Sequence, residues 1–223
     1  MRRARPLPWL KPGVFVGASV PLAAIVWRAG RGELGANPIA QALNQLGLVA
    51  LVFLVAALAC TPLKTVFGWT WPIRLRRMLG LFGFFYAVVH VVAYIIFDPV
   101  AAVDAAARAR PWDAAADVVW AIGVDLVRPF FAIGWVAFVL LVPLAATSTA
   151  GMIRRLGGRR WRAVHRLAYV ATIASVVHGY WPLSLPVERY EILLATILAL
   201  RLARAYARRT PMSATNTLSG VTR

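Results

Sequence analysis

Long apolar segments, separated by short blocks of charged residues, run along the chain from end to end. A helix needs roughly 20 mainly apolar residues to cross the hydrocarbon core of a bilayer. Six segments are long and apolar enough to be predicted as spans. They cover residues 13–28, 43–62, 78–97, 129–149, 163–181 and 187–205. The pattern therefore predicts an all-α integral membrane protein, built as a bundle of six transmembrane helices.

The first segment differs from the others because it is short, contains Pro21 and follows a basic stretch. These features also fit a cleaved signal peptide, but residues 28–35 offer no clean small-x-small cleavage site. We therefore expect an uncleaved helix. The predicted organisation is a basic cytoplasmic N-terminus at residues 1–12, a transmembrane domain at 13–205 and a disordered cytoplasmic tail at 206–223.

Most of the 25 Lys and Arg residues lie at one end of the predicted helices, whereas all eight Asp and Glu residues lie at the other. Basic residues crowd both termini and the even-numbered connections, whereas the acids fall in the odd-numbered ones. Since cytoplasmic loops attract Lys and Arg, we expect both termini in the cytoplasm. The net charge of +17 then reflects topology and anionic lipid, so we expect no nucleic-acid partner. The long outer connection, 98–128, contains a short helical pattern at 113–124, interpreted as a lid or a docking surface.

The chain has only three histidines, His90, His165 and His178, and each lies in or at the mouth of a predicted span. An ionisable side chain inside a membrane is costly and is by default a candidate functional residue. Neutral imidazole is a common axial ligand of haem iron, and helix-packing or proton-relay histidines are the alternative. A single cysteine, Cys60, excludes an intrachain disulfide and a four-cysteine zinc or iron–sulfur site.

The predicted topology puts two of these histidines at similar depth. At about 1.5 Å per residue, His90 lies about 18 Å and His178 about 22 Å from the inner ends of their helices. They are therefore predicted to clamp one haem in the outer half of the membrane. His165 lies only about 3 Å in and has no histidine partner. One possibility is that it is the ligand of an inner haem, whose opposite position is open or holds a non-histidine ligand. The other is that it is a surface residue that binds lipid phosphate.

Four stretches of the chain carry motifs in a specific order. They are Thr61-Pro62-Leu63-Lys64, Arg76-Arg77-Met78-Leu79-Gly80-Leu81-Phe82 leading to His90, Arg128-Pro129-Phe130 through Thr147-Ser148, and Trp161-Arg162-Ala163-Val164-His165-Arg166 leading to His178 and Trp181. In these stretches the chain resembles the MsrQ (YedZ) family, within the ferric-reductase-like transmembrane group. The resemblance covers roughly residues 43–205 and departs from the pattern at Ala146, where a bulkier residue is expected.

This resemblance implies a haem-binding membrane subunit with one or two b-type haems and an associated FMN. It implies that electrons pass from the quinone pool or a cytosolic flavin reductase to a periplasmic, MsrP-like molybdenum-cofactor enzyme. That partner reduces methionine sulfoxide in oxidised envelope proteins, which places the chain in the bacterial inner membrane. We expect an electron-transfer subunit rather than the catalytic one, because the sequence has no glycine-rich nucleotide fingerprint and no cysteine constellation. The electron donor is then a separate molecule.

A group of arginines at the predicted cytoplasmic face suits haem propionates, flavin phosphate or lipid headgroups. These residues are Arg76, Arg77, Arg160, Arg162 and Arg166. The positive-inside rule alone would also account for them. Two other functions stay open on the residues alone: a haem-containing ferric or metal reductase, and a non-haem proton-coupled transporter. Such a transporter should show inverted repeats and broken helices near the midplane, and neither is evident in the sequence.

Overall fold

The computed structural model describes residues 9–97, 119, 122–123, 126–180, 195–197 and 199, and within them it contains helices and no strand. The helices are α1 (Leu10–Gly30), α2 (Pro38–Phe67), α3 (Trp71–Phe97), α6 (Pro129–Ala146), α7 (Ala150–His165) and α8 (Leu167–Tyr180). Among the described residues, α1, α2, α3 and α6 are long and apolar enough to cross a membrane. The predicted helical, multi-pass membrane class is confirmed.

Several sequence-based predictions fall on residues outside this description. The short helix at 113–124, most of the sixth span at 187–205 and the tail at 206–223 lie there wholly or largely. The six-helix count and the cytoplasmic termini therefore stay predictions. Within the sixth span, Ile197 is described, and it is buried against α2 and α8 residues, including Val55 and Val176.

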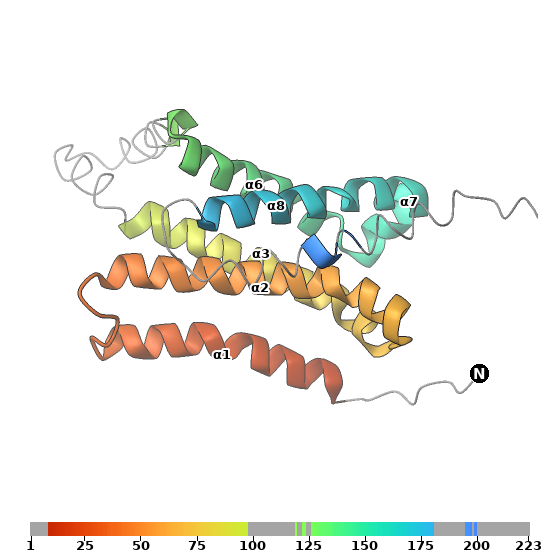
Figure 1. The fold of residues 1–223 in the computed structure, drawn as a ribbon, viewed down its shortest axis with the longest axis horizontal. Coiled ribbons are helices and arrows are strands. Elements are labelled where there is room, and N and C mark those ends of the chain that lie inside the picture. Colours follow the sequence, from red (N-terminus) through yellow and green to blue (C-terminus); the bar gives the residue numbers. More distant parts are fainter. Residues whose placement is uncertain are drawn as a thin grey trace, which may run out of the picture.

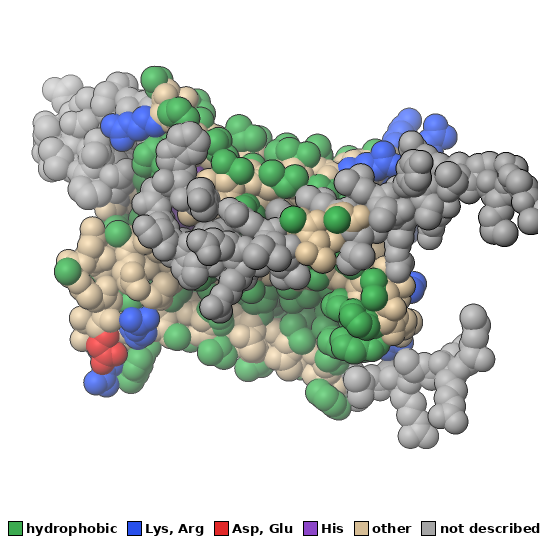
Figure 2. Space-filling view, in the orientation of Figure 1, with side chains coloured by type: hydrophobic (Ala, Val, Ile, Leu, Met, Phe, Trp, Pro, Cys, Tyr) green, Lys and Arg blue, Asp and Glu red, His purple; other side chains and the backbone are tan. Residues whose placement is uncertain are grey.

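The helices form two closely packed pairs, α2 with α3 and α6 with α8 (Figure 1). Contacts of α2 with α8 and of α3 with α6 join the pairs, and α1 lies along the outside of α2 and α3. The α1–α2 turn, the end of α3 and the start of α6 lie at one end of the bundle, whereas α7 lies at the other. Figure 2 shows charged side chains of the described residues near the two ends and apolar ones over the middle, the surface expected of a membrane protein.

Capping residues explain where α2 begins and ends. The Asn37 side-chain oxygen accepts a hydrogen bond from the Ala40 N–H at 3.1 Å, and Pro38 occupies the first turn, where a missing N–H costs nothing. The helix ends at Gly68, whose φ of +71° is the left-handed conformation that only glycine adopts readily.

A run of hydroxyl residues ends α6 and starts α7. The Ser148 hydroxyl donates to the Leu144 carbonyl at 2.7 Å, which satisfies one of the last carbonyls of α6. The Thr147 hydroxyl adds a bond of 2.6 Å to the Pro143 carbonyl, which also accepts the Thr147 N–H. Two residues later, the Thr149 side chain accepts from the Met152 N–H at 3.2 Å and caps α7. The predicted fourth span, 129–149, therefore ends at Ala146.

The predicted fifth span, 163–181, is divided differently in the structure. α7 ends at His165, α8 begins at Leu167, and Arg166 between them joins the two by i→i+3 backbone hydrogen bonds. α7 is kinked at Gly157, whose φ of +69° is not helical, and it has no buried residue. Basic side chains lie on both sides of the kink, so α7 is an interfacial rather than a spanning segment. His165 consequently belongs to this polar helix and not to the apolar helix that carries His178.

A tyrosine from α3 holds α1 against the bundle. Pro21 removes one backbone donor from α1, and the fully buried Tyr86 hydroxyl inserts beside it. This hydroxyl donates to the Ala18 carbonyl at 2.7 Å and accepts from the Leu22 N–H at 3.1 Å. Ala18 and Leu22 are an i,i+4 pair on either side of the proline, so the tyrosine hydroxyl bridges two backbone groups of α1.

Candidate functional site

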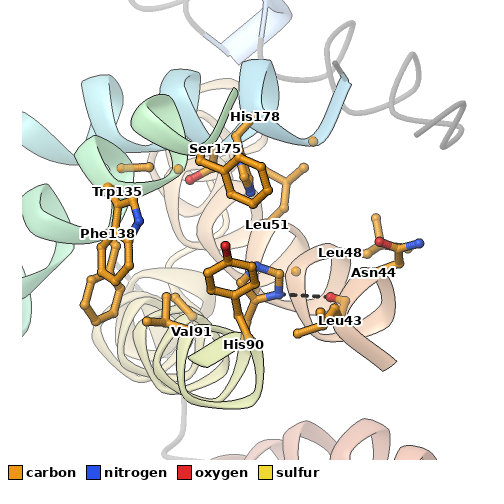
Figure 3. Close-up of a pocket in the computed structure, with 18 of the residues that line it drawn as sticks. Leu43, Asn44, Leu48, Leu51, His90, Val91, Trp135, Phe138, Ser175 and His178 are labelled. Carbon is orange, nitrogen blue, oxygen red and sulfur yellow. Dashed lines mark hydrogen bonds between the residues drawn. The ribbon is translucent and has the colours of Figure 1, made fainter. Parts of the chain in front are cut away.

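Two histidine rings from different helix pairs face one cavity. His90 lies on α3 and His178 on α8, and their ring centroids are 6.3 Å apart with an angle of 82° between the ring planes. Figure 3 shows the two side chains reaching into the same space from opposite sides. The two histidines that the sequence predicts at similar depth therefore lie together.

Each ring is hydrogen-bonded to a backbone carbonyl of the neighbouring helix. The Nδ1 of His90 lies 2.9 Å from the Leu43 carbonyl oxygen of α2, and the Nδ1 of His178 lies 3.0 Å from the Phe130 carbonyl oxygen of α6. A carbonyl can only accept, so Nδ1 carries the proton and donates in both rings. The other ring nitrogen, Nε2, then has a free lone pair, the form in which histidine binds a metal.

A glycine one helical turn after each carbonyl makes room for the ring. A Cβ built on Gly47 would lie 3.4 Å from Nδ1 of His90, and one built on Gly134 would lie 2.7 Å from the Cε1 of His178. The carbonyl and the histidine are 47 residues apart in the first pair and 48 in the second. The α2–α3 and α6–α8 pairs thus hold a histidine by the same device.

The cavity between the pairs has a volume of about 350 Å³. Its walls come from α2, α3, α6 and α8 and are mainly apolar. The lining side chains with polar atoms are Asn44, His90, Tyr94, Trp135, Ser175 and His178. Most of the lining residues of α2 and α6 lie in the first halves of these helices, whereas those of α3 and α8 lie in the last halves. The cavity therefore lies toward the end of the bundle that holds the α1–α2 turn, which the predicted topology makes the outer end.

The donor set fits a haem better than a bare metal ion. Among the described residues, no group of three His, Cys, Asp or Glu side chains lies close enough to hold a metal. A structural zinc ion takes four protein ligands, whereas haem iron needs only one or two axial ligands from the protein. A metal–imidazole bond of about 2 Å, plus roughly 1 Å from nitrogen to ring centre, puts a shared metal about 3 Å from each centroid. Half of the 6.3 Å separation agrees with that distance.

His165 lies in a second cluster, away from this cavity. Its ring stacks on Trp161 with centroids 3.9 Å apart, and its Nδ1 donates to the Trp161 carbonyl at 3.1 Å. Burial lowers the pKa of His165, the hydrogen bond opposes this shift, and the positive charge of Arg76 adds to it. His165 is therefore held neutral near an arginine.

The five predicted arginines divide between two environments. Arg76 is half-buried on α3 and donates to the Thr61 hydroxyl of α2 at 3.2 Å. The other four, Arg77, Arg160, Arg162 and Arg166, are exposed. Only Arg76 is therefore positioned within the helix packing, beside His165.

The comparisons with known proteins agree with this architecture. Residues 42–176 match the family described as the ferric reductase like transmembrane component. Relatives named protein-methionine-sulfoxide reductase heme-binding subunit MsrQ occur in Deinococcus radiodurans (38% identical, 91% of this chain and 93% of the relative), Rhodospirillum rubrum (43%, 88% and 88%) and Herminiimonas arsenicoxydans (40%, 96% and 92%). The chain belongs to the MsrQ family. This confirms the family predicted from the motifs, and the MsrQ relatives match nearly the whole chain.

The histidines were found from sequence, but the groups that orient them were not. The Leu43 and Phe130 carbonyls are backbone atoms, which no residue pattern reveals. Gly47 and Gly134 read as ordinary small residues of apolar helices. In this member of the MsrQ family, the sequence signal is a glycine, Gly47 or Gly134, four residues after the carbonyl that binds a histidine.

Proposed function

We propose that the chain is a haem-b electron-transfer subunit of the bacterial inner membrane. It passes electrons from the quinone pool or a cytosolic flavin reductase to a periplasmic, MsrP-like molybdenum-cofactor methionine sulfoxide reductase. The names of the MsrQ relatives support the haem and the reductase system. The observation that carries the proposal is the pair of histidines whose Nδ1 atoms are both bound to carbonyls at one apolar cavity.

His90 and His178 are the residues that would hold the haem, and haem supplies one-electron chemistry when bound. The Leu43 and Phe130 carbonyls orient the rings and increase the basicity of the ligating nitrogens. Apolar walls exclude water and so favour the less charged, reduced state of the iron. The position of the cavity toward the predicted outer end supports delivery of electrons to a periplasmic partner.

The second cluster, here called the inner cluster, is the candidate site for electron uptake. It consists of Arg76 and His165 at the end of the bundle that the predicted topology makes cytoplasmic, with four exposed arginines: Arg77, Arg160, Arg162 and Arg166. These groups suit FMN phosphate, a haem propionate or a lipid headgroup, all of which are anionic. In this proposal His165 serves an inner haem or the bound flavin.

The spectrum of the purified protein tests the outer site. A reduced-minus-oxidised spectrum should show b-type bands, and His90→Ala or His178→Ala should each remove most of the haem because either change breaks the clamp. His165→Ala is the matched control and should leave the outer haem in place. Full haem content and an unchanged low-spin spectrum in both ligand variants would contradict the assignment.

The electron donor is tested separately. A reduced quinol, or a flavin reductase with FMN, should reduce the haem in membranes that contain the protein. NADPH with the purified chain alone should not, because the sequence holds no nucleotide-binding fingerprint. Stoichiometric reduction by NADPH without an added flavoprotein would overturn this part of the proposal.

A further inference from the structure

Each histidine contacts a carbonyl and a glycine of the neighbouring helix, but the glycine contact of His178 is closer than that of His90. On α2, a Cβ added to Gly47 would meet the His90 ring at 3.4 and 3.5 Å, which is ordinary van der Waals contact. On α6, a Cβ added to Gly134 would lie 2.7, 2.8 and 3.1 Å from three atoms of the His178 ring. The His178 ring is therefore seated directly on the α6 backbone, where only a glycine leaves room.

A second contact fixes the plane of the His178 ring. Phe130, whose carbonyl accepts from Nδ1, also stacks its own ring on His178, with centroids 4.3 Å apart and 11° between the planes. Among the described residues, His90 has no stacking partner of this kind. Its ring contact is the one with His178, at 82°. The plane of the His178 ring is thus held by a hydrogen bond, an aromatic face and the α6 backbone. The plane of the His90 ring is held mainly by its hydrogen bond.

We propose that Phe130 and Gly134 form a positioning site that fixes the plane of His178 nearly perpendicular to that of His90, and so sets the electronic state of the haem iron. This inference rests on the proposed haem site. An imidazole donates electron density into the iron d orbital perpendicular to its own plane. Two perpendicular imidazoles affect two d orbitals equally and leave them nearly degenerate, whereas parallel rings split them.

This degeneracy has a direct spectroscopic consequence. Ferric low-spin haem with perpendicular axial rings gives a strongly anisotropic electron paramagnetic resonance (EPR) signal with one very large g value. Parallel rings give a rhombic signal with a smaller maximum g value. The wild-type protein should show the strongly anisotropic signal for its outer haem, because the protein, and not the haem, sets the ring planes.

Three variants of the full-length protein test the positioning site. In Gly134→Ala the new Cβ displaces the His178 ring from α6. This should lower haem affinity about 10-fold or more, as the loss of groups that orient a metal-binding histidine does. The haem that remains should show a smaller maximum g value. Phe130→Leu keeps the carbonyl but removes the stacked face, so it should retain haem and shift the g value in the same direction. Gly47→Ala, at the equivalent position of α2, brings its Cβ only to 3.4 Å from the His90 ring, so it should change both measurements much less than Gly134→Ala does.

The outcomes separate this inference from the function on which it rests. A wild-type protein without haem would overturn the proposed function and this inference together. A wild-type protein with low-spin haem but a rhombic signal would overturn this inference alone. Wild-type g values in both α6 variants would also refute it, as would a change in Gly47→Ala as large as in Gly134→Ala. Where Gly134→Ala does not fold, Phe130→Leu alone decides.

Discussion

Replacing Tyr86 by Phe should loosen α1 without disturbing the histidine cavity. The hydroxyl is fully buried and makes two hydrogen bonds, to the Ala18 carbonyl and from the Leu22 N–H. Leaving a buried polar group unsatisfied costs about 1–3 kcal/mol. Apolar surroundings leave no water to replace the lost partner.

The expected cost is smaller than the sum for two groups, because Ala18 and Leu22 are an i,i+4 pair and can bond to each other once the hydroxyl is gone. Pro21 opposes that adjustment, since its ring crowds the carbonyl four residues earlier. We therefore expect Tyr86→Phe to lower the free energy of unfolding by about 1–3 kcal/mol, measured by denaturant titration in detergent. Tyr86 does not line the cavity, so haem content and spectrum should stay at wild-type values.

A double-mutant cycle tests this reasoning directly. In a Pro21→Ala background no proline ring crowds the backbone of α1, so Ala18 and Leu22 can pair with each other and Tyr86→Phe should cost less there than in the wild type. Equal costs in the two backgrounds would refute the idea that the hydroxyl compensates for the proline. A cost near zero in the wild-type background would show that the two hydrogen bonds contribute nothing.

Three further predictions concern helix packing and the inner cluster. Gly83→Ala should lower the free energy of unfolding by about 1–3 kcal/mol, because the new Cβ would lie 2.8 Å from the Cδ2 of Leu54. Gly80→Ala, one turn away, would place its Cβ 3.9 Å from the Cβ of Ala57 and should be nearly neutral in the same denaturant titration. His165→Ala should slow reduction of the haem by a cytoplasmic-side donor while the spectrum of the outer haem stays largely intact. Wild-type values of both the stopped-flow rate and the haem-to-protein stoichiometry would exclude a role in electron uptake. Because the pKa of His165 is lowered in the folded protein, this histidine takes up its proton first in the unfolded chain as pH falls. The stability that neutral His165 contributes is therefore present above about pH 6.5 and is lost as pH falls toward the lowered pKa. A His165→Gln variant should lack this pH dependence of unfolding.

Apolar length and charge placement predicted most of the helices, because lipid imposes a strong and simple constraint on a spanning segment. The same constraint says little about polar segments at the interface. Residues 163–165 are therefore predicted as part of the fifth span, although in the structure they are the end of the basic α7. Helix ends fixed by hydroxyls, as at Thr147, are likewise decided by local hydrogen bonds that hydropathy does not record.

The candidate site was predictable as far as the identity and depth of two histidines. Imidazoles inside apolar helices are rare enough to be noticed, and the rise per residue gives their depth. Their angular setting was not predictable, because it depends on carbonyls of helices distant in sequence. The role of Tyr86 was hidden for the same reason: its partners Ala18 and Leu22 are backbone groups of another helix.

The repeated device also explains how the site can form at all. His90 is oriented by α2 within the α2–α3 pair, and His178 by α6 within the α6–α8 pair, so each histidine is oriented by contacts within its own pair. The cavity lies where the two pairs meet, and a cavity at an interface costs packing energy. A ligand bound by both histidines would offset that cost and tie the pairs together, since binding to the folded state alone stabilises it. The association of the two pairs should therefore depend on the cofactor more strongly than the packing within either pair.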